Sequence, residues 1–378
     1  MKIKVTYIVS SFMRCGPINM LYSLVAGLDP EQFEISAITL KPEPDNTRIK
    51  DFEALGVTVK RAGDRDTHFL FGLGRSIADR IKELRPDVVH THGPWADYYG
   101  GAVRDIPTVV NIHNKLAEDY VPLYGAALGW LTTMMDARAM RRVTRAIAVS
   151  DSVASVAEAK YGIESDVIVN GVDIERYAVP DKDTSTKLRK ALGISEERYV
   201  FLHVGNMIQR KNPALILEAY QRAAVHMPLS ELIFLGDGPL LEECRSNYEN
   251  CSSIRFCGNV SNVSEFLSAA DCVVSATASD GMSMATLEAL ACGLRGLMSD
   301  IDVHREIRER FVSNPAEFLV CEINVDAFAE GFRAQYDQGR KKNTVEKKAI
   351  SSAAMAKQYA DLYKSLARPD MSVAAPAK

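Results

Sequence analysis

This chain of 378 residues lacks a long apolar run, and that absence limits where the protein works. No stretch approaches the roughly 18 consecutive apolar residues that a membrane-spanning helix needs. The N-terminal run MKIKVTYIVSSF is too short for the apolar core of a signal peptide and has no small-residue cleavage site, so we interpret it as a first β-strand. We therefore expect a cytoplasmic protein, either free or peripheral at the inner face of the membrane.

Cysteine motifs and a basic excess are also missing. The seven cysteines are scattered and odd in number, without C-x-x-C or zinc-like spacing, which indicates reduced thiols. The 45 basic and 49 acidic residues give a net charge of −4, which argues against a general nucleic-acid binder. The remaining balance, 47% apolar and 25% charged, is that of a globular protein with material for two domains.

Short β-branched runs alternate with amphipathic helical patterns along most of the chain. Alternation of this kind predicts parallel sheets with helices on both faces. Right-handed crossovers then make each half a doubly wound, Rossmann-like α/β domain. The predicted strands cover residues 4–11, 33–40, 57–62, 87–92, 107–113 and 146–150 in the first half, and 199–205, 231–238, 253–259, 272–277 and 295–300 in the second.

The boundary between the halves is predicted in the polar, turn-rich segment 171–195, which we interpret as an interdomain linker. It separates an N-terminal domain, 1–170, from a C-terminal domain, 196–345. A helix at about 345–367 is expected to pack back on the first domain, and 368–378 to be a disordered tail. Two facing domains would form a cleft at the carboxyl ends of their strands, where a doubly wound sheet binds its ligand.

The stretch SDGMSMATLEALACG, residues 279–293, combines a helix start with two acids eight residues apart. A helix N-terminus attracts phosphate, and Gly281 lets the backbone approach a ligand closely. Asp280 lies before the predicted helix and Glu288 two turns inside it, so the acids suit a ligand with hydroxyls at both ends and phosphates between them. A nucleotide-diphosphate sugar has that layout.

This segment resembles the E-x7-E motif of retaining GT-B glycosyltransferases of family 4, written here as D-x7-E. The resemblance implies GT-B architecture, in which two Rossmann-like domains face each other across a cleft. It also implies that Asp280 holds the donor sugar and Glu288 binds the ribose. The backbone contacts that it implies lie at Gly281, Met282, Ser283, Met284 and Ala285.

Other stretches of the second half carry the same resemblance. HVGNMIQRKN, residues 203–212, is similar to the loop that binds the diphosphate, with Lys211 at the lysine position. Asn206 stands at the arginine position, and Arg210 is the expected substitute. The segment RFCGNV implies that the base is bound near Val260.

In the first half, FMRCGPINM resembles the family's glycine loop, which contains Gly16, and VVNIHN its strand with a catalytic histidine. This implies that His113 lies beside the reacting centre. We predict His90 and His92 on opposite sides of their strand, assign His90 to structure, and leave His92 open between structure and cleft.

Three further patterns lead to weaker interpretations. GLGRSIA, residues 72–78, has no clear preceding strand, so it is not taken as a dinucleotide fingerprint. DID, 300–302, is not taken as a metal site, because the family carries this phrase without metal. A basic stripe is either a solvated face or a patch for anionic lipid or an acceptor phosphate; it consists of Arg138, Arg141, Arg142 and Arg145.

The sequence and the resemblance together predict a retaining hexosyltransferase that uses a nucleotide-diphosphate sugar, with UDP favoured over GDP. They predict no metal and no cofactor, a saccharide or lipid-linked acceptor of polysaccharide or glycolipid biosynthesis, and no nucleic acid; the oligomeric state stays open. Two alternatives remain: a nucleotide-sugar epimerase, or a non-catalytic subunit that binds a nucleotide sugar. The second alternative is motivated by two differences from the family's pattern: Asp280 stands where the motif has glutamate, and Asn206 stands at the arginine position.

Overall fold

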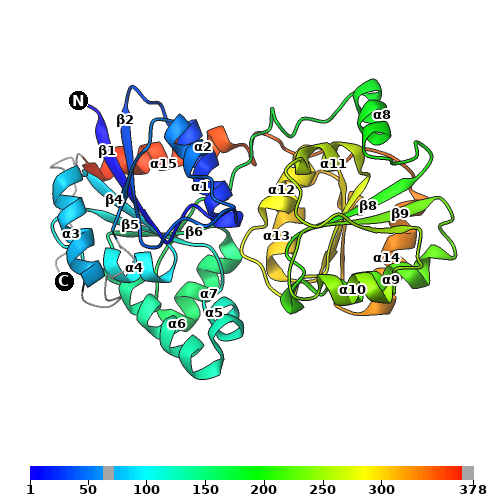
Figure 1. Ribbon diagram of the computed structural model, residues 1–378, viewed down its shortest axis with the longest axis horizontal. Helices are drawn as coiled ribbons and strands as arrows, with labels where there is room; N and C mark the ends of the chain where they lie inside the picture. The colour runs from blue at the N-terminus through cyan, green and yellow to red at the C-terminus, as the bar shows by residue number, and fades with distance from the viewer. Residues whose placement is uncertain (63–71, 368–378) are drawn as a thin grey trace. The chain divides into compact units, whose positions relative to one another are not determined.

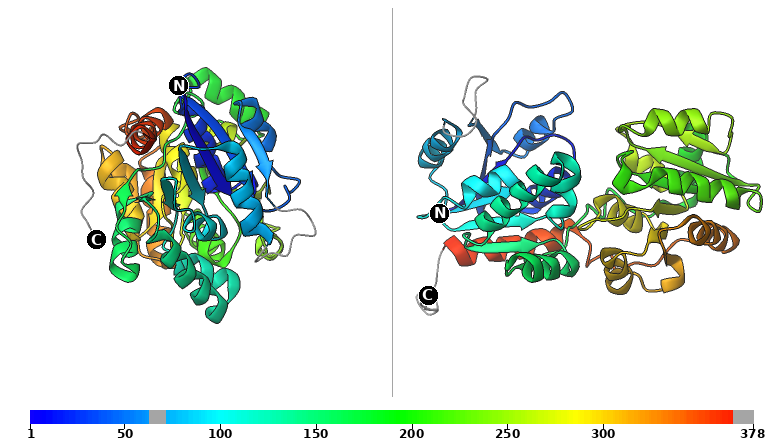
Figure 2. Two further views of the ribbon diagram at one scale, coloured as in Figure 1. Left: turned by 90° about the vertical axis from the view of Figure 1, so that its left-hand side faces the viewer. Right: turned by 90° about the horizontal axis from the view of Figure 1, so that it is seen from below.

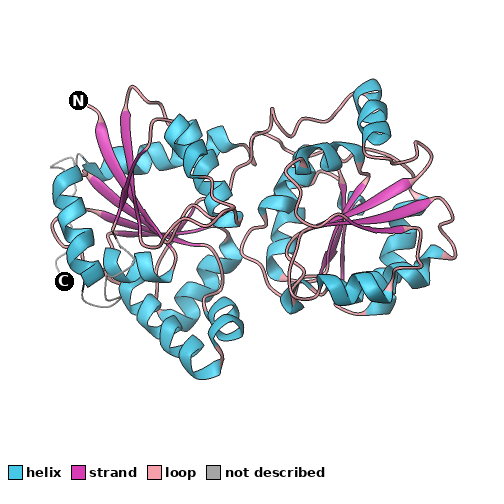
Figure 3. Cartoon of the chain, viewed as in Figure 1, coloured by secondary structure: helices cyan, strands magenta, loops and turns pink. Residues whose placement is uncertain are grey.

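The computed structural model describes residues 1–62 and 72–367, and the chain divides into two compact units. Unit 1 consists of Met1–Gly171 with Ser352–Lys378, and unit 2 of Val172–Ser351. Each unit is a parallel β-sheet with helices packed on it (Figure 3). The predicted fold class, two Rossmann-like α/β domains, is confirmed.

Unit 1 is built on a seven-stranded sheet with the order β3-β2-β1-β4-β5-β6-β7 (Figure 1). The order reverses between β1 and β4, and a doubly wound sheet binds its ligands at such a point. The strands are β1 (Ile3–Val9), β2 (Phe33–Thr39), β3 (Thr58–Arg61), β4 (Val88–His92), β5 (Thr108–Ile112), β6 (Arg145–Ala148) and β7 (Asp166–Val167). The helices are α1 (Gly16–Gly27), α2 (Ile49–Ala54), α3 (Gly72–Leu84), α4 (Pro94–Gly100), α5 (Ala117–Tyr124), α6 (Ala126–Met140), α7 (Asp151–Tyr161) and α15 (Ser352–Ala367).

The C-terminal helix α15 belongs to unit 1, although its sequence follows unit 2. It packs against α1, where a Cβ on Gly27 would come within 2.6 Å of the Ala356 Cβ. Tyr363 anchors it to the sheet, because its phenol lies 2.9 Å from the Tyr7 phenol and 2.7 Å from His90 Nδ1. Figure 2 shows this red helix alongside the strands of unit 1.

Unit 2 has a six-stranded sheet with the order β10-β9-β8-β11-β12-β13, which reverses between β8 and β11. Its strands are β8 (Tyr199–Val204), β9 (Ser230–Leu235), β10 (Ile254–Phe256), β11 (Cys272–Ser275), β12 (Arg295–Ser299) and β13 (Phe318–Cys321). Its helical elements are α8 (Lys182–Ala191), η1 (Gln209–Lys211), α9 (Pro213–Ala224), α10 (Leu241–Asn247), α11 (Val263–Ala269), α12 (Met284–Ala291), α13 (Asp302–Phe311), η2 (Pro315–Glu317) and α14 (Val325–Asp337).

The segment predicted as a linker, 171–195, differs from the prediction because it contains helix α8 and is part of unit 2. Asp181 caps this helix by accepting a hydrogen bond from the Thr184 amide at 2.7 Å. Arg189, on α8, is buried and forms an ion pair with Asp271 at 2.6 Å, which fixes the helix to the sheet. The predicted tail 368–378 lies outside the described residues.

Candidate functional site

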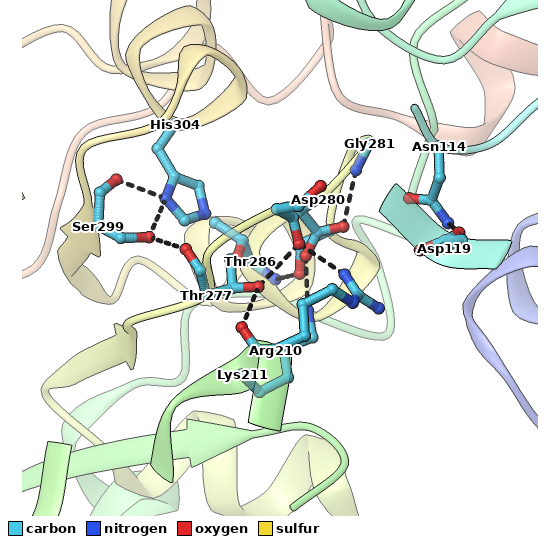
Figure 4. A network of polar contacts seen from close by, with 12 residues as sticks. Asn114, Asp119, Arg210, Lys211, Thr277, Asp280, Gly281, Thr286, Ser299 and His304 are labelled. Atoms are coloured by element: carbon cyan, nitrogen blue, oxygen red, sulfur yellow. Dashed lines mark hydrogen bonds and ion pairs between the residues drawn. The ribbon is translucent and has the colours of Figure 1, made fainter. Parts of the chain in front are cut away.

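The loops that follow β8 and β11 meet beside the point where the order of the unit 2 sheet reverses. Lys211, at the end of η1, extends its ammonium to within 2.6 Å of Asp280 Oδ2 (Figure 4). Both side chains are mostly buried, at 17% and 13% exposed. The structure therefore brings together the two residues that were predicted to hold the diphosphate and the donor sugar.

Further hydrogen bonds fix the same two loops to each other. Arg210 donates a side-chain hydrogen bond to the Ser279 carbonyl at 2.5 Å, and its own carbonyl accepts one from the Ala278 amide at 2.9 Å. Asn212 donates its side-chain amide to the Ala276 carbonyl at 2.9 Å and has a left-handed backbone with φ of 48°. These bonds hold the segment that carries Arg210 and Lys211 against the loop that carries Asp280.

Asp280 is held ionised by its surroundings. Burial alone would raise its pKa, but the charge of Lys211 and the hydrogen bond from it keep the pKa below the usual value, with smaller contributions from His304 and Arg210. His304 is itself buried, which lowers its pKa to about 4, and its Nδ1 lies 2.8 Å from the Ser299 carbonyl. Near neutral pH the site therefore holds a carboxylate, two cations and a neutral imidazole.

Helix α12 begins immediately after this pair and directs its N-terminus toward it. Ser283 caps the helix by accepting a hydrogen bond from the Thr286 amide at 3.3 Å, and the Gly281 amide donates to Asp280 Oδ1 at 2.9 Å (Figure 4). Met284 is the first residue of the helix and Ala285 the second. The positive end of the helix dipole thus adds to the charge of Lys211 and Arg210.

Glu288 lies one turn further along α12 and interacts with the phenol of Tyr177. Burial raises the pKa of Tyr177, and the negative charge of Glu288 raises it further, so the phenol stays protonated. A protonated phenol donates a hydrogen bond and can orient the carboxylate. The sequence motif predicted Glu288 but not this partner, which is 111 residues earlier in the chain.

The loops after β8, β9 and β10 come into close contact through glycines. Gly236 has φ of 138°, and a Cβ there would lie 1.9 Å from the Gly205 carbonyl oxygen. The Gly236 amide donates to the Gly258 carbonyl at 2.8 Å, so backbone lines this edge of the sheet. Asn206 is exposed here and lines a shallow depression of about 380 Å³ with Ile208, Asp237, Gly238 and Pro239. Val260 is half-buried just beyond Gly258.

Unit 1 contains a separate cavity of about 240 Å³ at the carboxyl ends of β1, β4 and β5. His113, immediately after β5, lines it together with His92 at the end of β4. Other residues at its wall come from the loop after β1, from α4, from β5 and from α5 and α6; they include Cys15, Asp97, Asn111, Asp119, Tyr120 and Met140. Gly16, the first residue of α1, is exposed and does not line the cavity. A Cβ on it would meet nothing within 4 Å.

The prediction that His90 and His92 face opposite sides of the strand was wrong. Residues two apart on a strand point to the same side, and the two rings lie 4.5 Å apart between centroids. His92 Nδ1 is 2.9 Å from His113 Nε2, so one ring donates to the other. Burial lowers the pKa of His113 to about 4 and, with the neighbouring histidines, that of His92 well below its usual value. Both are neutral imidazoles at neutral pH.

Three residues that line this cavity each have one buried polar atom without a hydrogen-bond partner among the described residues: His92 Nε2, Asp97 Oδ2 and Asn111 Nδ2. The amide oxygen of Asn111 is fully used, since His90 Nε2 lies 2.8 Å away and Tyr359 donates to it at 2.9 Å. Buried polar groups are normally paired. An ordered water, or a ligand hydroxyl that reaches these atoms, would complete their hydrogen bonding.

Asp97, at the wall of this cavity, forms with Asp136 a pair of buried acids that the sequence did not single out. Tyr120 donates to Asp136 Oδ2 at 2.6 Å, and the Thr91 hydroxyl donates to Asp97 Oδ1. Burial raises the pKa of Asp136 to about 7; burial and the charge of Asp136 raise that of Asp97 well above its usual value. Their separation in the sequence hides the pair, because no local pattern links Asp97 to Asp136.

Two weaker interpretations can now be evaluated. The basic stripe is not confined to one helix, because α6 ends at Met140, Arg141 is its C-cap and Arg145 begins β6. All four arginines are nevertheless exposed. In DID, Asp300 and Asp302 both form ion pairs with Arg305, at 2.6 and 3.1 Å, so these acids are engaged within the protein.

Within residues 1–62 and 72–367, no group of three or more His, Cys, Asp or Glu side chains is arranged to hold a metal ion. In the same residues, no helix is both long and apolar enough to cross a membrane.

Comparison with known proteins agrees with the geometry of both units. Residues 16–176 match the model of Glycosyltransferase Family 4, and residues 198–338 match that of Glycosyl transferases group 1. The chain is 26% identical over 268 residues to UDP-Gal:alpha-D-GlcNAc-diphosphoundecaprenol alpha-1,3-galactosyltransferase of Escherichia coli, covering 67% of each chain. It is 23% identical over 269 residues to Alpha-monoglucosyldiacylglycerol synthase of Streptococcus pneumoniae, covering 66% of this chain and 60% of the relative.

Among solved structures, the chain is similar to Anabaena Alr3699/HepE in complex with UDP-glucose, with a TM-score of 0.78 and 17% identity. The match covers 96% of this chain and all of that one, and it concerns the fold. The two family models account for most of the described residues in both units. The chain therefore belongs to the glycosyltransferases of the family 4 and group 1 type, with the GT-B fold.

Proposed function

We propose that this glycosyltransferase transfers a hexosyl group from a UDP-sugar to an acceptor hydroxyl, with retention of configuration and without a metal ion. The observation that carries the proposal is the Lys211–Asp280 pair at the N-terminus of α12. Lys211, Arg210 and the helix N-terminus supply the positive charge for a diphosphate. Asp280 supplies an acceptor for a sugar hydroxyl, and Glu288 for a ribose diol.

The choice of UDP is supported by two proteins to which the chain is similar. The E. coli relative is named as a UDP-Gal-dependent galactosyltransferase, and the Anabaena structure contains UDP-glucose. The names of the E. coli and S. pneumoniae relatives support a role in glycoconjugate biosynthesis.

In this reaction the bond between the anomeric carbon and the diphosphate oxygen breaks, and a bond from the same carbon to the acceptor oxygen forms on the same face. The acceptor proton passes to the departing diphosphate, so no side chain acts as a covalent nucleophile. Lys211 and Arg210 stabilise the charge that develops on the leaving group. His113 is neutral because burial lowers its pKa to about 4, which suits a hydrogen bond to a substrate hydroxyl rather than a charge contact.

The acceptor is proposed to bind in the unit 1 cavity. Its three unpartnered polar atoms, on His92, Asp97 and Asn111, can pair with hydroxyl groups of a saccharide. A hydroxyl both donates and accepts, which matches a wall that holds the Asn111 amide donor and the ring nitrogen of His92.

The test begins with thermal unfolding in the presence of UDP, GDP, ADP and TDP, first with EDTA and then with magnesium. A ligand at about a hundred times its Kd adds roughly 2.7 kcal/mol of stability, so UDP alone should raise Tm without metal. Incubation with UDP-sugars and saccharide acceptors, followed by NMR of the product, should give the anomeric configuration of the donor. Binding of no nucleotide would refute the donor site, an inverted product would refute retention, and donor isomerisation without acceptor would identify an epimerase.

A further inference from the structure

The α5–α6 hairpin of unit 1 exposes a concentrated apolar surface. Of the fourteen large hydrophobic residues that are exposed in the described part of the chain, six fall within residues 123–134. They are between 38% and 69% exposed, and Figure 1 shows their hairpin projecting from the sheet of unit 1. We define them as the hairpin tip: Leu123, Tyr124, Leu128, Trp130, Leu131 and Met134. Apolar patches of this density mark interaction sites.

Close packing on the inner face of the hairpin shows that this exposure is not the result of a loose structure. A Cβ on Gly129 would lie 2.5 Å from the Val121 Cα, so the two helices touch through their backbones. Thr133 and Ala137 are fully buried on the same face of α6, which packs on α4. The hairpin therefore has a fixed inner face, and its apolar outer face is part of the folded surface.

Positive charge follows the apolar residues directly along the outer face. Leu131, Met134 and Arg138 are three and four residues apart, so they share one side of α6. Three more exposed arginines, Arg141, Arg142 and Arg145, follow Arg138 in the sequence, at or beyond the end of α6 that is away from the tip. Going away from the tip, the surface is thus first apolar, with Trp130 and Tyr124 among the apolar side chains, and then cationic.

We propose that the hairpin tip inserts into an anionic lipid bilayer, with the arginines at the level of the phosphate headgroups. Acyl chains accept apolar side chains, the interface favours Trp and Tyr, and an anionic surface attracts Arg, so such a bilayer offers a partner to the hairpin tip and to the arginines that follow it. A second copy of the chain would bury the apolar residues but would give no role to the adjoining arginines.

Docking of this kind would bring the unit 1 cavity to the lipid surface, because the inner side of the same hairpin forms part of the cavity wall through Tyr120 and Met140. We therefore infer that the acceptor is carried by a lipid. This second step rests on the proposed function, whereas the docking itself does not.

The chain has two tryptophans, Trp95 and Trp130, and this makes insertion directly measurable. Trp95 packs against a buried core cluster, so Trp95→Phe leaves exposed Trp130 as the reporter. The variant is mixed, without nucleotide sugar, with vesicles of phosphatidylcholine alone or with phosphatidylglycerol added. We expect a blue shift of the emission, and quenching by brominated acyl chains, only with the anionic vesicles.

Paired variants separate the two parts of the surface in a vesicle sedimentation assay. Leu131→Gln with Met134→Gln should abolish binding, whereas Val225→Gln with Leu229→Gln, exposed apolar residues of unit 2, should leave it unchanged. Arg138→Gln with Arg142→Gln should weaken it on the order of 30-fold, at about 1 kcal/mol per arginine. Lys187→Gln with Lys190→Gln, exposed on α8, removes the same charge and should have little effect.

Three results would overturn the proposal. The first is an unquenched Trp130 with anionic vesicles, and the second is wild-type binding by the Leu131 and Met134 variant with unchanged thermal unfolding. The third is a dimer in light scattering that the same variant converts to monomers, which would assign the surface to a second copy. Since no nucleotide is present, each result leaves the donor site untouched, and UDP binding tests that site separately.

Discussion

The ammonium of Lys211 lies 2.6 Å from Asp280 Oδ2, although 69 residues separate the two in the sequence. Both residues belong to unit 2. In this pair, a cation suited to a phosphate and an acid suited to a sugar neutralise each other. Breaking a buried pair by removing one partner leaves the other charge uncompensated. The proposed donor offers both phosphate and hydroxyl groups, so on binding it would replace the partner of Lys211 and the partner of Asp280 at once.

Asp280→Asn should separate donor binding from turnover. The amide keeps the size of the side chain but loses the charge, so we expect transfer to fall at least about 100-fold, the magnitude typical of a lost transition-state contact. UDP affinity should be kept or increased, because Lys211 loses its carboxylate partner. Initial rates with saturating UDP-sugar and calorimetric titration of UDP measure the two effects.

The control is Asp300→Asn, which removes an acid that pairs with Arg305 on the surface of the same unit. It should leave both quantities unchanged. Transfer by Asp280→Asn within twofold of wild type would exclude a role for this carboxylate in the reaction.

Tyr177→Phe tests how Glu288 is oriented. The ring is retained and only the phenol is lost, so we expect a loss of about 1 kcal/mol in UDP binding, or roughly five-fold in Kd. Tyr199→Phe is the matched control, since the buried Tyr199 phenol has no hydrogen-bond partner among the described residues. Equal UDP affinity in both variants and the wild type would show that Glu288 does not need this partner.

The sequence predicted those parts of the fold and site that depend on local patterns. β-Branched runs marked the strands, and the acid spacing around α12 marked Asp280 and Glu288. The α8 helix was missed because it has few apolar residues and is held mainly by its cap and by the ion pair of Arg189. His90 and His92 were assigned to opposite sides, although the alternation of side chains along a strand puts them on the same side.

Contacts between distant segments could not be predicted from local patterns. Asp97 and Asp136 belong to different helices, and Tyr177 lies far from Glu288 along the chain. Only the packing of α4 against α6 brings the first pair together. Four of the six residues of the hairpin tip lie in the apolar stretch LGWLTTMM, residues 128–135, but a helix with apolar residues on several sides does not reveal which side is exposed.

Gly236→Ala should destabilise unit 2 where the loops after β8 and β9 meet. The added Cβ would lie 1.9 Å from the Gly205 carbonyl oxygen, and the backbone φ of 138° is unfavourable for alanine. Because the obstacle is backbone, we expect a loss of about 3 kcal/mol or more and no measurable UDP binding. Hydrogen exchange of peptides from β8 and β9 would detect the local loss of stability.

Gly258→Ala is the comparison for this effect. It also has a positive φ, of 66°, but its Cβ would meet nothing within 4 Å. The left-handed backbone alone costs about 1–2 kcal/mol. If the two variants were equally stable, steric contact between the loops would not explain the need for glycine at 236.

The buried acids and histidines of unit 1 predict opposing effects of pH on its stability. Burial lowers the pKa of His113 from 6.5 to about 4, so the unfolded chain binds a proton that the folded one does not, and stability is lost as the pH falls through this window. Burial raises the pKa of Asp136 from 3.8 to about 7, so the folded chain holds the extra proton. The stabilisation that comes from protonated Asp136 is present at low pH and is lost as the pH rises toward 7.

Removing each group should therefore change the pH slope of the unfolding free energy in opposite directions. Between about pH 4.5 and 6.5, His113→Gln should lower the slope by about 1.4 kcal/mol per pH unit, and Asp136→Asn should raise it by a similar amount. Urea unfolding followed by tryptophan fluorescence measures this, because both tryptophans lie in unit 1. His226→Gln, at an exposed position of unit 2, is the control, because the tryptophans do not report the unfolding of that unit. Shifts of the same sign in the two variants would contradict a folded unit 1 that keeps His113 neutral and Asp136 protonated at mildly acidic pH.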